Sequence, residues 1–183
     1  MSDAPNVAVA LSPISGDPGL VEATASIADP VEREVNCRVT LRNPGDTAVR
    51  VDNPYEGLTY HLISDDGTPV EVKAPPSAAK VRAPRDPLAK RAYVDVVGAT
   101  VEGTHHDVEE FIRASSFELG PGGTLELSLA VRSSIDPSDR SVLDLVPAGD
   151  YHLVVMVRTV VEREGARLPL LLRTDRDLDV TVV

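Results

Sequence analysis

Apolar and polar residues alternate over most of the chain, and turn residues interrupt the alternation at short intervals. Such a period of two places every second side chain on the same face of a β-strand. The clearest case is the stretch 35–42, where Val35, Cys37, Val39 and Leu41 alternate with polar residues. Many short strands with turns between them predict an antiparallel all-β protein, and we expect about ten strands packed as a β-sandwich.

Further strands follow the same pattern along the rest of the chain. They are predicted at residues 6–12, 20–27, 48–52, 58–62, 70–72, 92–97, 125–132, 151–157 and 178–182. In the strand at 151–157, Val154 and Met156 are apolar on the face opposite Tyr151 and Leu153. Strands that are apolar on both faces are typical of sheet interiors, so we predict that this strand is central and covered on both sides.

Turn residues indicate how the strands connect. The segment 43–46 is NPGD, and its third residue, Gly45, suits a type II turn, in which that position has a positive φ. The segment DDG at 65–67 predicts a hairpin. The segment GPGG at 120–123 resembles a ligand-binding glycine loop, but such a loop leads into a helix. Because an alternating strand follows it, we predict a plain turn between strands.

One short helix is predicted within residues 104–116. Thr104 and Asp107 have the spacing of a capping box, and apolar residues at helical spacing follow them. We therefore expect a single β-sandwich domain over residues 1–183, carrying one insertion at about 75–116 that consists of a loop and this short helix.

Charge excludes several classes of partner. The formal net charge is −11, which repels nucleic acid and anionic membrane surfaces, so neither is an expected partner. One basic segment, residues 80–91 with Arg82 and Arg85, departs from this trend. It is read either as a solvated loop or as an anion-binding patch, and it has no interleaved aromatic residues for stacking.

Localisation is predicted from what the chain contains. No stretch approaches the roughly 18 apolar residues of a membrane span, and the first residues lack the basic start of a secretory signal. The single cysteine, Cys37, cannot form an internal disulfide and lies at an apolar position of a strand. We therefore expect a cytoplasmic protein in which Cys37 is a buried small apolar residue.

The sequence lacks the common motifs for catalysis and cofactor binding. The sequence has no nucleophile elbow, phosphate-binding loop, dinucleotide fingerprint or zinc-protease helix, so we expect a non-enzymatic protein without cofactors or bound metal. The cluster HHDVEE at 105–110 could coordinate a metal, but acidic residues at a helix start are more often solvated. His61 and His152 each follow a tyrosine within a strand and could form a pH-sensitive pair on one surface.

The order of strands and turns resembles a known family. The stretches CRVTLRNPGDTAVRV, DDGTPV, FELGPGGTLELSL and VPAGDYHLVVMV are similar to the strands and turns of bacterial immunoglobulin-like sandwiches, in particular intracellular proteinase inhibitors of the BsuPI type. Pro147, Gly149 and Tyr151 are the nearest match to the family's PGxY turn, with Ala148 inserted. The resemblance covers roughly residues 33–160 and implies an immunoglobulin-like two-sheet fold and a regulator of proteinases.

The functional prediction is a non-enzymatic protein-binding or interaction module, including the possibility of a proteinase-inhibitor-like regulator. Binding residues concentrate on loops held by a rigid scaffold, so we expect partner contacts in two loops. The candidate partner-binding residues are Asn53, Tyr55, Glu56, Arg82 and Arg85. The alternative is a structural subunit of a larger assembly that pairs through exposed strand edges.

Overall fold

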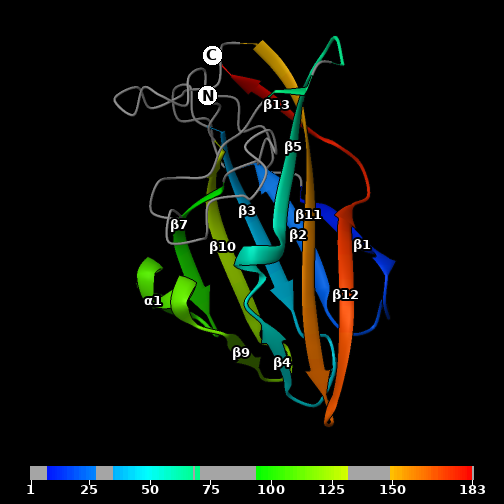
Figure 1. Ribbon diagram of the computed structural model, residues 1–183, viewed down its shortest axis with the longest axis vertical. Coiled ribbons are helices and arrows are strands. Elements are labelled where there is room, and N and C mark those ends of the chain that lie inside the picture. Colours follow the sequence, from blue (N-terminus) through cyan, green and yellow to red (C-terminus); the bar gives the residue numbers. More distant parts are fainter. Residues whose placement is uncertain (1–7, 28–34, 68, 71–93, 132–148, 183) are drawn as a thin grey trace, which may run out of the picture.

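The computed structural model describes residues 8–27, 35–67, 69–70, 94–131 and 149–182. Antiparallel strands dominate this part of the chain, which confirms the all-β prediction (Figure 1). The strands are β1 (Val9–Ser15), β2 (Glu22–Ile27), β3 (Val35–Arg42), β4 (Val49–Asp52), β5 (Leu58–Ser64), β6 (Pro69–Val70), β7 (Val94–Val101), β8 (Thr104–His106), β9 (Ser116–Leu119), β10 (Thr124–Val131), β11 (Gly149–Arg163), β12 (Ala166–Thr174) and β13 (Leu178–Val182). The helices are the 3-10 helix η1 (Pro54–Gly57) and the α-helix α1 (Val108–Arg113).

The strands form one hydrogen-bonded sheet in the order β6-β5-β11-β12-β1-β2-β3-β10-β7-β8. This sheet curls into a half-barrel, so that β5 and β11 face β3 and β10 across a shared interior (Figure 1). Irregular pairing helps it bend: β1 has a bulge between Pro13 and Ser15, and β10 shifts its register on β7 between Ser128 and Leu129. Such bulges increase the local twist of a sheet.

Strand β11 is the centre of one half of the molecule, as its sequence predicted. One of its edges pairs with β5 and then β4, and the other pairs with β13 and then β12. Tyr151, Leu153, Val155 and Val157 point into the interior and are all buried. On the opposite face Val154 is 4% exposed, so cover on both sides is confirmed at this residue.

A single apolar core fills the half-barrel. Alternating residues of the facing strands supply it, as the periodicity predicted: Cys37, Val39 and Leu41 are each 1% exposed. Burial raises the pKa of the Cys37 thiol to about 12, so this cysteine stays a neutral, unreactive core residue at physiological pH.

The buried side chain of Asn43 joins two turns at the lower end of the molecule in Figure 1: the turn that follows β3 and the turn between β9 and β10. Its amide nitrogen donates to the carbonyl oxygens of Thr47 (2.8 Å), Leu119 (3.1 Å) and Gly120 (3.1 Å). The turn at Gly120 leads from β9 into β10, which confirms a connection between strands. The predicted type II turn is wrong: Gly45 does not have a positive φ, because Asn43 Oδ1 accepts its backbone N–H and fixes a different turn.

Helix α1 exists but begins later than predicted. Asp107 is its N-cap, and its carboxylate accepts from the N–H groups of Glu109 and Glu110 at 3.0 and 3.2 Å. The capping role predicted for Thr104 is wrong, because Thr104 belongs to β8. A two-residue hairpin at Glu102 and Gly103, with φ of 51° and 76°, sends the chain back along β7 before the helix can start.

The segment predicted as an insertion contributes a strand to the sheet. Residues 94–101 form β7, which pairs with β10 along its length, while residues 71–93 lie outside the described part of the chain. Within the described residues, no helix is both long and apolar enough to cross a membrane.

Candidate functional site

The predicted binding residue Asn53 uses its side chain for hydrogen bonds within the molecule. Its side-chain nitrogen donates to the carbonyl oxygens of Phe111 (2.7 Å) and Ala114 (2.9 Å), at the end of α1. Its side-chain oxygen accepts the N–H of Tyr55 at 3.0 Å and caps η1. Asn53 therefore ties the loop after β4 to the helix after β8, a structural role that the sequence did not reveal.

The structure describes the other predicted binding residues only in part. Tyr55 is half-buried and packs against the core cluster. Glu56 lies in η1, but its side chain is outside the described part of the structure. Arg82 and Arg85 also lie outside the described residues, so a partner-binding role for these positions stays a prediction.

The histidines of the HHDVEE cluster do not share a helix with its acidic residues. His105 and His106 lie in β8, and the ring of His106 meets Phe117 edge to face, with ring centroids 6.3 Å apart. Helical spacing between His105 and Glu109 is therefore lost. Within the described residues, no three histidine, cysteine or acidic side chains gather closely enough to hold a metal ion.

His152 joins three elements at the other end of the molecule. Its Nε2 lies 3.0 Å from an oxygen of Asp65, in the β5–β6 turn, and its Nδ1 lies 3.0 Å from an oxygen of Asp179, on β13. The hydrogen bond to Asp179 and the charge of Asp65 raise the pKa of His152. Both ring nitrogens face carboxylates, so His152 is not placed to activate a hydroxyl nucleophile. The register pairs His61 of β5 with Val154 of β11, and the side chain of His61 lies outside the described part of the structure.

A surface that the sequence analysis missed lies on the outer face of β11 and β12. Three alternate cross-strand pairs make up this outer strip: Met156–Arg173, Arg158–Leu171 and Val160–Pro169. Directly opposite residues share a face of an antiparallel sheet, and the residues between them are buried in the core. The six side chains of the outer strip therefore face away from the interior together.

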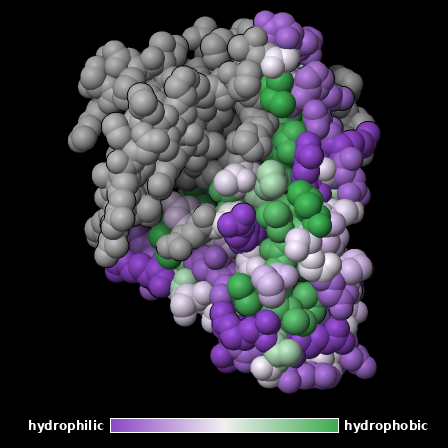
Figure 2. Space-filling model, turned by 45° about the vertical axis from the view of Figure 1, so that its right-hand side comes forward, coloured by the Kyte–Doolittle hydropathy of each residue, from purple (hydrophilic) through white to green (hydrophobic). Residues whose placement is uncertain are grey.

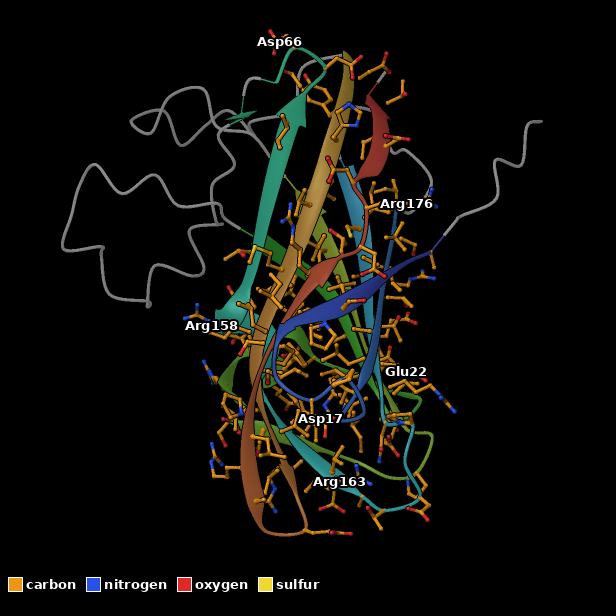
Figure 3. All side chains as sticks on the ribbon, turned by 90° about the vertical axis from the view of Figure 1, so that its right-hand side faces the viewer. Asp17, Glu22, Asp66, Arg158, Arg163 and Arg176 are labelled. Atoms are coloured by element: carbon orange, nitrogen blue, oxygen red, sulfur yellow. The ribbon has the colours of Figure 1, made fainter. Side chains whose placement is uncertain are left out.

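The outer strip combines apolar surface with positive charge. Met156, Val160 and Leu171 are half-buried, whereas Arg158, Pro169 and Arg173 are exposed. Ile14, at the β1 bulge next to β12, is 56% exposed. Figure 2 shows a band of hydrophobic residues along this side of the molecule, and Figure 3 shows Arg158 projecting outward beside the start of β5.

The arginines of the outer strip have no acidic partner in the part of the chain that the structure describes. The strip itself contains no acidic residue, although the whole chain has 29 of them. Acidic residues occur at its ends, where Glu162 pairs with Arg167 at 3.6 Å and Asp175 follows β12. The outer strip is thus a small positive, partly apolar surface on an acidic protein.

The sequence contained a signal for this surface. Met156 is apolar on the second face of its strand, a pattern that predicts a central strand but does not by itself predict a surface patch. The stretch LPLLLRT at 168–174 has apolar residues on both faces as well, but a sequence does not show that these two second faces lie side by side.

Comparison with known proteins adds no identification: no protein family, curated protein or solved structure matches this chain. The function is therefore argued from the surfaces described above.

Proposed function

We propose that the protein is a non-enzymatic protein-binding module whose docking surface is the outer strip on β11 and β12. The observation that carries this proposal is the half-buried apolar surface at Met156, Val160 and Leu171 beside two arginines that have no acidic partner among the described residues. Methionine and arginine are enriched at protein interfaces, where acidic residues are depleted. Exposed apolar patches on folded proteins commonly mark such interfaces.

The contrast with the opposite outer face supports the same proposal. On β2, β3 and β10 the outward arginines are already paired: Arg42 with Glu22 at 2.9 Å and Arg38 with Glu126 at 3.4 Å. Those charges are satisfied within the chain and face water. The outer strip has comparable arginines that form no such pair with any described residue, which supports a role for their charge in binding another molecule.

Site-specific crosslinking tests the proposal. A photo-crosslinking residue in place of Leu171 is expected to give a discrete adduct with a second protein in the native cell, and the same residue in place of Thr40 is not. Thr40 is the matched control because it is half-buried and lies on the outer face of β3. Identical adduct patterns at the two positions would rule out the outer strip as the docking surface.

Proteinase inhibition is the narrower form of the proposal that the family resemblance suggests. We propose inhibition together with cytoplasmic residence. We also propose an immunoglobulin-like form of the fold, which is supported by the two strand layers around one core. Strand β1 joins these layers by pairing with both β2 and β12. Titration of cytosolic proteinases tests inhibition, and unchanged proteolysis at stoichiometric excess of the protein would remove it.

Edge pairing in a larger assembly is the second candidate. Among the described residues, β13 pairs only with β11, and the first half of β12 extends beyond β1 with one edge unpaired. Pro169 lies in that half and cannot donate a backbone hydrogen bond, a feature that protects edge strands from pairing. We rank this candidate second, and sedimentation that shows only a monomer at high concentration would exclude self-assembly.

A further inference from the structure

The arrangement of the outer strip specifies a kind of partner. In the two pairs Met156–Arg173 and Arg158–Leu171, each arginine stands opposite an apolar residue on the neighbouring strand. The arginines therefore occupy one diagonal of a four-residue block, and the apolar side chains occupy the other. Arginine forms bidentate pairs with carboxylates, and its aliphatic stem can lie against apolar neighbours.

Charge complementarity favours an acidic partner over a second copy of this chain. A symmetric dimer through the outer strip would bring the same patch of two molecules together, so its uncompensated arginines would face each other. A net charge of −11 on each copy adds long-range repulsion to that contact. A partner segment that carries carboxylates places opposite charges against the arginines, so it avoids the direct contact of like charges within the interface.

We propose that the outer strip binds a segment of a partner protein in which carboxylates flank an apolar side chain, a proposal that rests on the proposed function. The carboxylates pair with Arg158 and Arg173, which have no ion pair within the described chain. The apolar side chain covers Met156 and Leu171, which are both half-buried. Glu162 and Asp175, at the two ends of the strip, limit the length of an acidic segment that fits.

Defined peptides test this inference on the full chain. The probes are synthetic peptides in which Leu alternates with Glu, with Gln or with Lys, and binding is measured by fluorescence anisotropy. We expect the Glu–Leu peptide to bind, the Gln–Leu peptide to bind more weakly, and the Lys–Leu peptide not to bind. Affinity for the Glu–Leu peptide is expected to fall as salt is added, because ion pairs at the surface are screened.

Substitutions then locate the contact. Replacing Arg158→Gln and Arg173→Gln together is expected to weaken binding of the Glu–Leu peptide by about tenfold or more. The matched control is Arg38→Gln with Arg42→Gln on the opposite outer face, which is expected to leave the affinity unchanged. Thermal unfolding of both double variants confirms that each is folded.

The outcomes separate this inference from the proposed function. Equal affinity of the Arg158→Gln/Arg173→Gln variant and the unchanged protein, or equal binding of the three peptides, overturns the acidic partner. If that happens while the crosslink at position 171 persists, the strip is a docking surface for a partner of other chemistry. Absence of the position-171 crosslink removes the docking surface itself.

Discussion

The arginines on the two outer faces of this half-barrel differ in whether they form ion pairs with other described residues. On β2, β3 and β10, arginines and glutamates pair across neighbouring strands, with Arg42 and Glu22 2.9 Å apart. On β11 and β12, the described arginines of the outer strip stand beside apolar residues instead. Both faces come from alternating strands, so alternation alone does not distinguish a face with paired charges from one with apolar residues beside arginines. The residue types at the outward positions do.

The largest difference in stability is expected between a substitution in the core and one in the outer strip. Leu127→Ala removes a core side chain that is 1% exposed and is expected to lower the free energy of unfolding by about 2–5 kcal/mol, because it leaves a cavity. Leu171→Ala is expected to cost about 1 kcal/mol or less, since this leucine is only half-buried. Urea unfolding measures the free energy of unfolding of both variants. Similar losses would show that Leu171 belongs to the core and not to an exposed strip.

The next effect concerns Asn53, whose polar atoms are used inside the molecule. Asn53→Ala removes the donors to the Phe111 and Ala114 carbonyl oxygens and the cap of η1, so we expect a loss of about 1–3 kcal/mol in unfolding free energy. Hydrogen exchange is expected to accelerate at the N–H of Tyr55, which loses its acceptor. Unchanged stability together with weakened partner binding would instead assign Asn53 to the binding site.

A smaller effect is expected where charges are paired on the surface. Glu22→Gln breaks the ion pair with Arg42 and is expected to cost at most about 1 kcal/mol, since both side chains are exposed and screened by solvent. Arg158→Gln breaks no ion pair among the described residues and is expected to leave stability unchanged. A loss of stability at Arg158 as large as at Glu22 would show that Arg158 forms an ion pair within the chain.

The smallest effect is expected from pH. The pKa of His152 in the folded protein is raised, so its stabilising contribution is complete below about pH 6.5, the ordinary imidazole value, and is lost as pH rises through the raised pKa. Asp65 and Asp179 face the ring, and Asp150 lies nearby on β11, where it accepts from Thr181. The measurement is amide exchange of β13 against pH, with His152→Gln as the control. An identical pH profile in the variant would exclude His152 as its source.

The strands were largely predictable because burial of one face imposes a period of two, and Cys37, Val39 and Leu41 show that period clearly. The start of α1 was not predictable in the same way. Glu102 has a φ of 51°, a conformation more typical of Gly or Asn, so its residue type does not predict the hairpin that displaces Thr104 from the helix.

The candidate site was predicted less well than the fold, for a reason that its contacts make clear. Asn53 looked like an exposed loop residue, yet its partners are Phe111 and Ala114, 58 and 61 residues further along the chain. The outer strip likewise depends on Arg158 standing opposite Leu171. Contacts of this kind are set by the order of strands in the sheet, which alternation does not encode.

The pairing of β1 with β12 determines when the sheet can be completed during synthesis of the protein. Leu11 stands opposite Thr174 in the sheet, so the two halves of the half-barrel can join only after residue 174 has left the ribosome. Until then β1 can pair only with β2, and one of its edges stays open during synthesis. The nascent chain is therefore most exposed to aggregation along that edge, where a chaperone would have to act.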